Sequence, residues 1–299
     1  MSRLKIWIQA FRLRTLPLSL ASIGMGSFLA LSHGSFKWAI FILTLLTTVC
    51  LQILSNLAND YGDFIHGADH NQREGPLRTV QQGLITPSQM KAALYVFSFS
   101  TLSIGIILLI FAFPFNYYFF IFLIIGLAAI LAAIAYTLGK KPYGYMGLGD
   151  ISVFIFFGLV GVIGSYYLQT KSINWNIILP SSACGFFAVG VLTVNNIRDI
   201  ESDKIAGKQS IPVRIGRKYA VWYYWALLFL GIASIVIYTI LTYSYYTQWL
   251  FVAVIPLVII NGRAVKLKLS RDLDPYLKQL AIITLVTVIL VGIGLIIKY

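Results

Sequence analysis

Long apolar runs without a charged side chain dominate the sequence. No Asp, Glu, Lys or Arg occurs in residues 92–139 or in residues 219–262. A helix that crosses the hydrocarbon core of a bilayer needs roughly 20 mainly apolar residues. Turn-forming clusters at residues 114–116 and 242–248 divide each run into two helices of about that length. The whole pattern predicts an all-α membrane protein with nine spanning helices, near residues 15–34, 38–58, 90–113, 117–138, 151–169, 175–197, 219–242, 248–265 and 277–297.

The composition excludes a soluble protein and changes how the basic charge is interpreted. The 299 residues are 59% hydrophobic and 11% charged, whereas soluble chains carry about 25% charged residues. A net charge of +13 would favour a nucleic-acid partner. The basic residues are, however, spread over separate short segments between the predicted spans, which excludes that class. We expect one transmembrane domain over residues 1–299, with Cys50 and Cys184 as packing residues inside spans.

The basic residues also predict the orientation of the chain. Cytoplasmic loops of membrane proteins carry the excess of Lys and Arg. With a cytoplasmic N-terminus, only Lys37, Lys171 and Lys298 of the 23 basic residues fall on the far side. An odd number of spans then places the C-terminus outside. We expect a multi-pass protein of the cell membrane in this orientation.

All ten acidic residues fall on the cytoplasmic side in this orientation, and two short motifs hold most of the chemistry. The first motif, at the end of the second predicted span, is Asn56, Asp60 and Asp63, and the second, at the end of the sixth, is Asn195, Asp199 and Asp203. Spacings of three or four residues place each motif on one face of a helix, if the helix continues to the membrane surface.

These side chains suit a divalent cation. Amide and carboxylate oxygens are hard ligands for Mg²⁺, which usually takes one or two protein carboxylates and bridges to substrate phosphates. Two facing motifs would suit two ions that hold one diphosphate. Basic residues downstream of the motifs, among them Arg73, Lys208 and Arg214, are candidates for the remaining phosphate charge.

The alternative for each motif alone is a solvated helix end with ordinary loop charges. The repetition argues against it, because Asp60 and Asp199 lie 139 residues apart and at equivalent places in two four-helix halves. A ligand site between two such repeats is common in membrane proteins. The sequence therefore predicts two four-helix pseudo-repeats and a final helix, with the site between the repeats.

A third segment, residues 136–150, is rich in Gly and Tyr. It could form a flexible wall of the same site, with tyrosines that face an aromatic or cationic species. It could equally be an interfacial tyrosine belt with glycine turns, which is the more common role of such residues.

The motifs in this order resemble those of the UbiA superfamily of intramembrane prenyltransferases. Residues 12–17 resemble its R-x-R-T-L-P opening, residues 56–63 its N-L-x-N-D-Y-x-D motif, and residues 195–203 the N-N-x-R-D-x-x-x-D motif. Residues 143–150 resemble its G-Y-x-G-L-G-[DE] loop. The last two motifs favour the subgroup of 1,4-dihydroxy-2-naphthoate polyprenyltransferases of menaquinone biosynthesis.

The resemblance implies a fold and a reaction. The fold is a helical bundle around a central cavity that opens sideways to lipid. The reaction transfers a polyprenyl group from its diphosphate to 1,4-dihydroxy-2-naphthoate with decarboxylation, which gives demethylmenaquinol. The catalytic residues and metal ligands would be the members of the two motifs, Asn56, Asp60, Asp63, Asn195, Asp199 and Asp203, with two Mg²⁺ ions, and the active site would face the cytoplasm. Arg14 or Tyr136 would contact the naphthoate, and Arg73, Lys208 and Arg214 the diphosphate.

Two kinds of alternative remain at this point. Another UbiA-type enzyme would prenylate 4-hydroxybenzoate or homogentisate. A divalent-cation or phosphate transporter would use the same acidic residues, but it should also place ionisable groups at mid-membrane depth. The carboxylates are expected at one membrane face only, which favours an enzyme.

Overall fold

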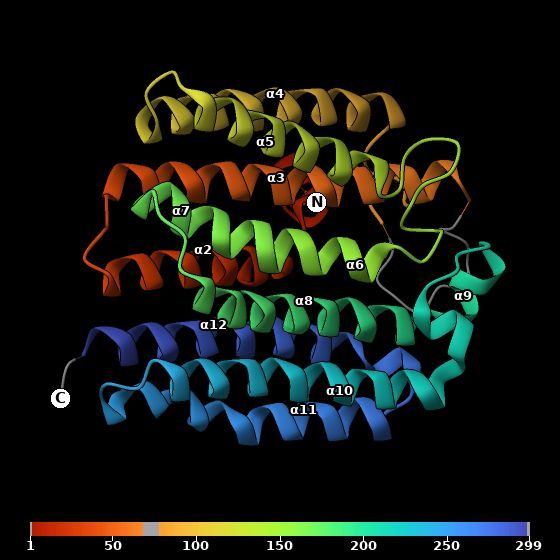
Figure 1. Cartoon of the computed structure of the whole chain (residues 1–299). Helices are drawn as coiled ribbons and strands as arrows, with labels where there is room; N and C mark the ends of the chain where they lie inside the picture. The colour runs from red at the N-terminus through yellow and green to blue at the C-terminus, as the bar shows by residue number, and fades with distance from the viewer. Residues whose placement is uncertain (1, 68–77, 298–299) are drawn as a thin grey trace.

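The structure, a computed structural model, describes residues 2–67 and 78–297. Within these residues it consists of helices and their connections, without strands (Figure 1). The first half contains α1 (Arg3–Phe11), η1 (Leu13–Thr15), α2 (Leu16–Ser32), α3 (Trp38–Ile65), α4 (Pro87–Ala112) and α5 (Tyr117–Ala135). The second half contains α6 (Gly149–Val153), η2 (Phe154–Ile163), α7 (Gly164–Thr170), η3 (Trp175–Ile177), α8 (Ile178–Arg198), α9 (Ile200–Ile205), α10 (Ile211–Leu241), η4 (Tyr246–Val254) and α11 (Ile255–Leu267). The chain ends with η5 (Ser270–Asp272) and α12 (Asp274–Ile296).

The nine predicted spans are confirmed in the described part of the chain. Nine helical segments there are long and apolar enough to cross a membrane. Several of them combine two short elements. The fifth span, for example, continues from α6 through the π-helical turns of η2 into α7, and the eighth begins with the 3₁₀ turns of η4. Large apolar side chains such as Phe99, Phe111 and Phe229 are exposed on the outside of the bundle, as expected for helices that face lipid.

The last helix joins the two halves of the bundle. In Figure 1, α3, α4 and α5 lie on one side, α10 and α11 on the other, and α2, α8 and α12 between them. α12 packs against both α2 and α8, and α8 also packs against α10 and η2. A large buried apolar cluster, which includes Leu29, Phe187, Tyr224, Phe251 and Leu280, fills the space among these helices. The C-terminal ends of α3 and α8 point to the same end of the bundle, where α9 lies (Figure 1).

The two acidic motifs differ in their backbone. The first lies within α3, which continues past the apolar segment to Ile65, so one helical face carries it as predicted. The prediction of a single continuous helix is wrong for the second motif. α8 ends at Arg198, and Asp199 caps it with φ −99° and ψ 15° before α9 begins. The Asp199 N–H still donates to Asn195 O (3.1 Å) and the Asp203 N–H to Asp199 O (2.8 Å), which keeps the helical spacing across the break.

Close packing in the centre of the bundle depends on small residues. A Cβ at Gly26 on α2 would lie 2.4 Å from the carbonyl oxygen of Val162 and 2.0 Å from the Ser165 hydroxyl. The Val162 carbonyl belongs to the backbone and cannot rotate away. Small residues commonly allow such close approach of membrane helices.

We therefore expect Gly26→Ala to destabilise the protein by about 1–3 kcal/mol, the usual cost of overpacking. Gly24→Ala on the same helix is the matched control, because its Cβ would approach nothing closer than 3.4 Å. Thermal unfolding of both variants in detergent measures the difference. Equal melting temperatures for the two variants would contradict this packing.

Candidate active site

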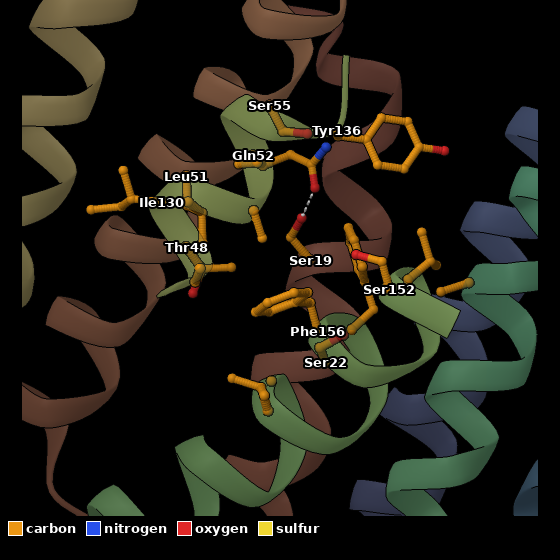
Figure 2. Close-up of a pocket in the computed structure, with 18 of the residues that line it drawn as sticks. Ser19, Ser22, Thr48, Leu51, Gln52, Ser55, Ile130, Tyr136, Ser152 and Phe156 are labelled. Atoms are coloured by element: carbon orange, nitrogen blue, oxygen red, sulfur yellow. Dashed lines mark hydrogen bonds between the residues drawn. The ribbon is translucent and has the colours of Figure 1, made fainter. Parts of the chain in front are cut away.

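A cavity of about 800 Å³ runs between the two halves of the bundle. Its wall is mostly apolar and includes residues of α2, α3, α4, α5, η2 and α8. Figure 2 shows its central part, where Ser19 on α2 donates to Gln52 Oε1 on α3 (2.6 Å) and Phe156 lies opposite Leu51. Residues of both acidic motifs line the same cavity, namely Asn56, Asp63, Asn195, Asp199 and Asp203.

The first motif is buried and partly held by its neighbours. Asn56 donates its amide to Phe11 O (2.9 Å) and to the Thr15 hydroxyl oxygen (3.0 Å), which attaches α3 to the N-terminal segment. Asp60 Oδ2 accepts from the Thr79 N–H (3.3 Å) and hydroxyl (2.6 Å). Its Oδ1 is buried and, within the described residues, has no hydrogen-bond partner.

Asp63 is the most heavily paired member of the first motif. Its Oδ1 accepts from the Tyr145 hydroxyl (2.5 Å) and lies 3.2 Å from Lys208 Nζ. Its Oδ2 forms an ion pair with Arg78. Three side chains from different parts of the chain thus converge on one buried carboxylate.

An arginine holds two members of the second motif. Arg198 donates from Nε to Asp199 Oδ1 (2.8 Å) and from Nη2 to Asp199 Oδ2 (2.6 Å), a bidentate pair. Its Nη2 also donates to Asn195 Oδ1 (2.9 Å). The third member, Asp203, lies on α9 with its Oδ1 3.2 Å from Lys208 Nζ.

Lys208 brings the two motifs together. Its Nζ lies 3.2 Å from Asp63 Oδ1 and 3.2 Å from Asp203 Oδ1, and 4.8 Å from the centre of the Tyr145 ring. An ammonium between two carboxylates is a position that another cation could also take. The prediction that both motifs contribute to one site agrees with this geometry.

Burial raises the pKa of several side chains around this end of the cavity. Burial raises the pKa of Asp203, and the nearby Lys208 charge opposes that rise. Burial, followed by the charge of Asp63, raises the pKa of Tyr145. Burial, followed by the charge of Asp150, raises the pKa of Tyr136. Both phenols therefore stay protonated at neutral pH and can donate hydrogen bonds.

The glycine- and tyrosine-rich segment, residues 136–150, forms part of the cavity wall. The structure therefore supports its interpretation as a wall of the site over that as an interfacial tyrosine belt. Tyr136, Tyr143, Tyr145 and Gly147 all line the cavity. The Gln209 N–H donates to Tyr145 O (2.8 Å) and joins this segment to the loop after the second motif. Gly147 has a φ of 84°, and a Cβ there would lie 2.5 Å from Gln209 O, so a glycine allows this close approach.

The remaining predicted residues lie in different places. Arg214 is exposed and donates from Nη2 to Met146 O (2.8 Å), so it supports the cavity wall from outside. Arg14 forms an ion pair with Asp274 (2.6 Å) and is not among the described residues that line the cavity. Arg73 lies outside the described residues.

Sequence analysis did not assign roles to several residues that the structure brings to the site. Tyr145, Arg198 and Asp274 belong to this group, whereas Arg78, which pairs with Asp63, is one of the basic residues downstream of the first motif that were expected to bind phosphate. Arg198 stands inside the second motif and could have been noticed there. The position of Asp274, 76 residues further on, depends on the packing of α12 and left no local signal.

The carboxylate and amide oxygens at this end of the cavity are suitable ligands for a Mg²⁺ ion that is bound together with a phosphate. Within the described part of the chain, no group of three or more His, Cys, Asp or Glu side chains is placed to hold a metal ion unaided. Mg²⁺ needs only one or two protein carboxylates when water and phosphate oxygens complete its octahedron. Asp60 is not among the described residues that line the cavity, but its buried Oδ1, which has no hydrogen-bond partner among the residues that the structure describes, is a position that a cation would satisfy. Asp63, Asp199 and Asp203 supply further carboxylates on the cavity wall.

Comparisons with known proteins agree with this architecture. The model of the UbiA prenyltransferase family matches residues 19–286. A protein of Haemophilus influenzae named 1,4-dihydroxy-2-naphthoate octaprenyltransferase is 43% identical over 99% of this chain and 97% of its own. The protein of the same name from Escherichia coli K12 is 40% identical over 92% of this chain and 88% of its own.

Solved structures share the fold at lower sequence identity. A UbiA homolog from Aeropyrum pernix is 19% identical and superposes with a TM-score of 0.66 over 95% of this chain and 96% of its own. A UbiA homolog from Archaeoglobus fulgidus bound to GPP and Mg²⁺ is 16% identical, with a TM-score of 0.66 over 96% and 99% of the two chains. Because the family model covers most of the sequence and the curated relatives cover nearly all of it, this chain belongs to the UbiA prenyltransferase family.

Proposed function

We propose that this protein, as a single transmembrane domain over residues 1–299, transfers a polyprenyl group from polyprenyl diphosphate to 1,4-dihydroxy-2-naphthoate. The product after loss of CO₂ is demethylmenaquinol, an intermediate of menaquinone biosynthesis. Relatives with 40–43% identity over nearly the whole chain carry the name of this activity. The observation that carries the proposal is that two acidic motifs from different halves of the bundle line one end of a long, mainly apolar cavity.

The polar end of the cavity suits the diphosphate. We propose that the members of the two motifs hold Mg²⁺, two ions in all, and that Asp60, Asp63, Asp199 and Asp203 are the catalytic carboxylates. Bound Mg²⁺ would supply positive charge that stabilises the leaving diphosphate. Lys208, already placed between Asp63 and Asp203, would add charge on the phosphate oxygens. Arg73 and Arg214 remain predicted diphosphate ligands.

The apolar part of the cavity suits the polyprenyl chain and the aromatic acceptor. Ionisation of the carbon–oxygen bond leaves an allylic cation, and apolar walls exclude the water that would otherwise react with it. The electron-rich naphthoate ring attacks the cation through the carbon that carries the carboxylate, and the electron pair of the C–CO₂ bond at that carbon returns to the ring as CO₂ leaves, which restores the aromatic ring. Tyr136, a protonated donor on the cavity wall, would hydrogen-bond the naphthoate. Arg14 remains a predicted second contact.

The reaction itself is the direct test. Purified protein in detergent with Mg²⁺, a polyprenyl diphosphate and 1,4-dihydroxy-2-naphthoate should give a prenylated, decarboxylated naphthoquinol, detected by mass spectrometry. Chelation of the metal should stop the reaction. Product from 4-hydroxybenzoate or homogentisate, with none from the naphthoate, would contradict the proposed acceptor.

Variants of the two motifs serve as controls for the same assay. Asp60→Asn and Asp199→Asn keep the shape of each side chain and remove its charge. Each should lower kcat by about 10²–10³-fold, the usual effect of losing a group that stabilises charge in the transition state. Asp272→Asn, at an exposed carboxylate of the same membrane side, should leave kcat unchanged. Near-normal turnover of either motif variant would contradict the shared site.

We also propose that the N-terminus and the acidic end of the cavity face the cytoplasm, in the cell membrane, with the C-terminus on the opposite side. The distribution of Lys and Arg supports this orientation. It predicts that the connection after α7 and the connection after α11 lie on opposite sides of the membrane. The first connection contains the exposed residue Ser172 and the second the exposed residue Asp272.

A cysteine-labelling experiment tests the orientation. With Cys50 and Cys184 replaced by Ala, a membrane-impermeant maleimide should label Ser172→Cys in intact cells. It should label Asp272→Cys only after the membrane is opened. The reverse pattern would place the active site on the outer face.

A further inference from the structure

Arg198 lies behind the second motif rather than in the cavity. Its side chain is 1% exposed, and it is not among the described residues that line the cavity. Asp199 and Asn195, whose side-chain oxygens it contacts, do line it. The guanidinium thus holds two cavity-facing oxygen ligands from the protein side, where a phosphate could not reach it.

Asp274 holds Arg198 in turn. Arg198 Nη1 donates to Asp274 Oδ1 (2.6 Å), and Asp274 Oδ2 accepts from Arg14 Nη1 (2.6 Å). Asp274 is the first residue of α12, and its side chain is 32% exposed. A chain of ion pairs therefore connects the start of the last helix with the end of α8 and with the segment before α2.

The contacts of Arg198 favour its staying in place when a cation binds. All three of its guanidinium nitrogens already donate to oxygens. Breaking these contacts would leave a buried charge without compensation, which is strongly unfavourable. A carboxylate has about four lone-pair sites, so the two hydrogen bonds from Arg198 do not use the whole acceptor capacity of Asp199.

We propose that Arg198 and Asp274 are positioning residues for Mg²⁺ binding. Arg198 fixes the orientation of Asp199 and Asn195, and Asp274 fixes Arg198. Ligating carboxylates are commonly oriented by such outer hydrogen-bond partners, whose loss weakens metal affinity about 10–100-fold. The proposal rests on the proposed function, because it takes Asp199 and Asn195 to be metal ligands. It also gives Arg14 a second role, as the partner that keeps Asp274 in place.

Metal affinity, measured without turnover, tests the proposal. Mn²⁺ is titrated into the full-length protein in detergent with an unreactive polyprenyl thiodiphosphate present, and free Mn²⁺ is followed by electron paramagnetic resonance against a blank that contains the thiodiphosphate without protein. Arg198→Lys keeps the charge but loses the bidentate geometry, and should weaken Mn²⁺ binding about 10–100-fold. Asp274→Asn should weaken it in the same direction. Unchanged or tighter binding in both variants would overturn the proposal.

Two control variants distinguish a loss of ligand positioning from a general loss of protein stability. Arg217 donates to the Ser270 hydroxyl (2.7 Å) and to Lys268 O, so it ties α10 to the loop immediately before α12. Arg217→Gln should lower the melting temperature of the metal-free protein without changing Mn²⁺ affinity. Asp272→Asn should change neither. If Arg217→Gln weakened Mn²⁺ binding as much as Asp274→Asn, the effect would be general loosening of this loop, and the proposal would be wrong.

A further variant separates this proposal from the function on which it rests. If Asp199→Asn weakens Mn²⁺ binding while Arg198→Lys and Asp274→Asn do not, the metal site stands and the positioning role falls. If Asp199→Asn leaves Mn²⁺ binding unchanged, Asp199 is not a ligand, and both the proposed metal site and the positioning role are wrong. Should Arg198→Lys fail to fold, Asp274→Asn, at the more exposed carboxylate, decides the outcome.

Discussion

Carboxylates buried in a helical membrane protein need cations or hydrogen-bond donors beside them, and the functional end of this molecule is organised around that requirement. An uncompensated charge in a low-dielectric interior is costly. Asp63 and Asp203 share Lys208, and Asp199 is paired with Arg198. Each of these pairs joins two segments of the chain or fixes a carboxylate on the cavity wall. Lys208 belongs to the loop after the second motif and lies beside Tyr145 of the glycine- and tyrosine-rich wall. Its pairing with Asp63 and Asp203 therefore also helps to place these two segments.

The same requirement links the two halves of the bundle. Because Asp63 lies on α3 and Asp203 on α9, the shared ammonium of Lys208 brings the ends of two distant helices to one place. Asp274, at the start of α12, forms an ion pair with Arg198 beside the second motif. Away from this end the cavity wall is largely apolar, with isolated polar contacts such as that between Ser19 and Gln52. One cavity therefore offers a charged end and an apolar length, as a diphosphate with a hydrocarbon chain requires.

Much of this architecture could be predicted from the sequence because its signals are local. Long uncharged runs predicted nine spans, and the spacing of Asn56, Asp60 and Asp63 predicted their shared helical face, which α3 confirms. The break at Asp199 was missed, because the i to i+4 spacing is the same with or without it. The partners of the carboxylates were missed for another reason. The contacts of Lys208 with Asp63 and of Asp274 with Arg198 depend on how segments distant in the chain pack. Arg198, by contrast, is adjacent to Asp199 in the sequence.

We propose that the two acidic motifs form one metal–diphosphate site. The most direct measurement is an experimental structure with Mn²⁺ and an unreactive polyprenyl thiodiphosphate, in which anomalous scattering locates the metal. We expect metal within about 2.0–2.6 Å, the usual range for hard cations, of oxygens from both motifs, with the diphosphate between them. Metal bound to only one motif, or a diphosphate held away from Asp63 and Asp203, would contradict it.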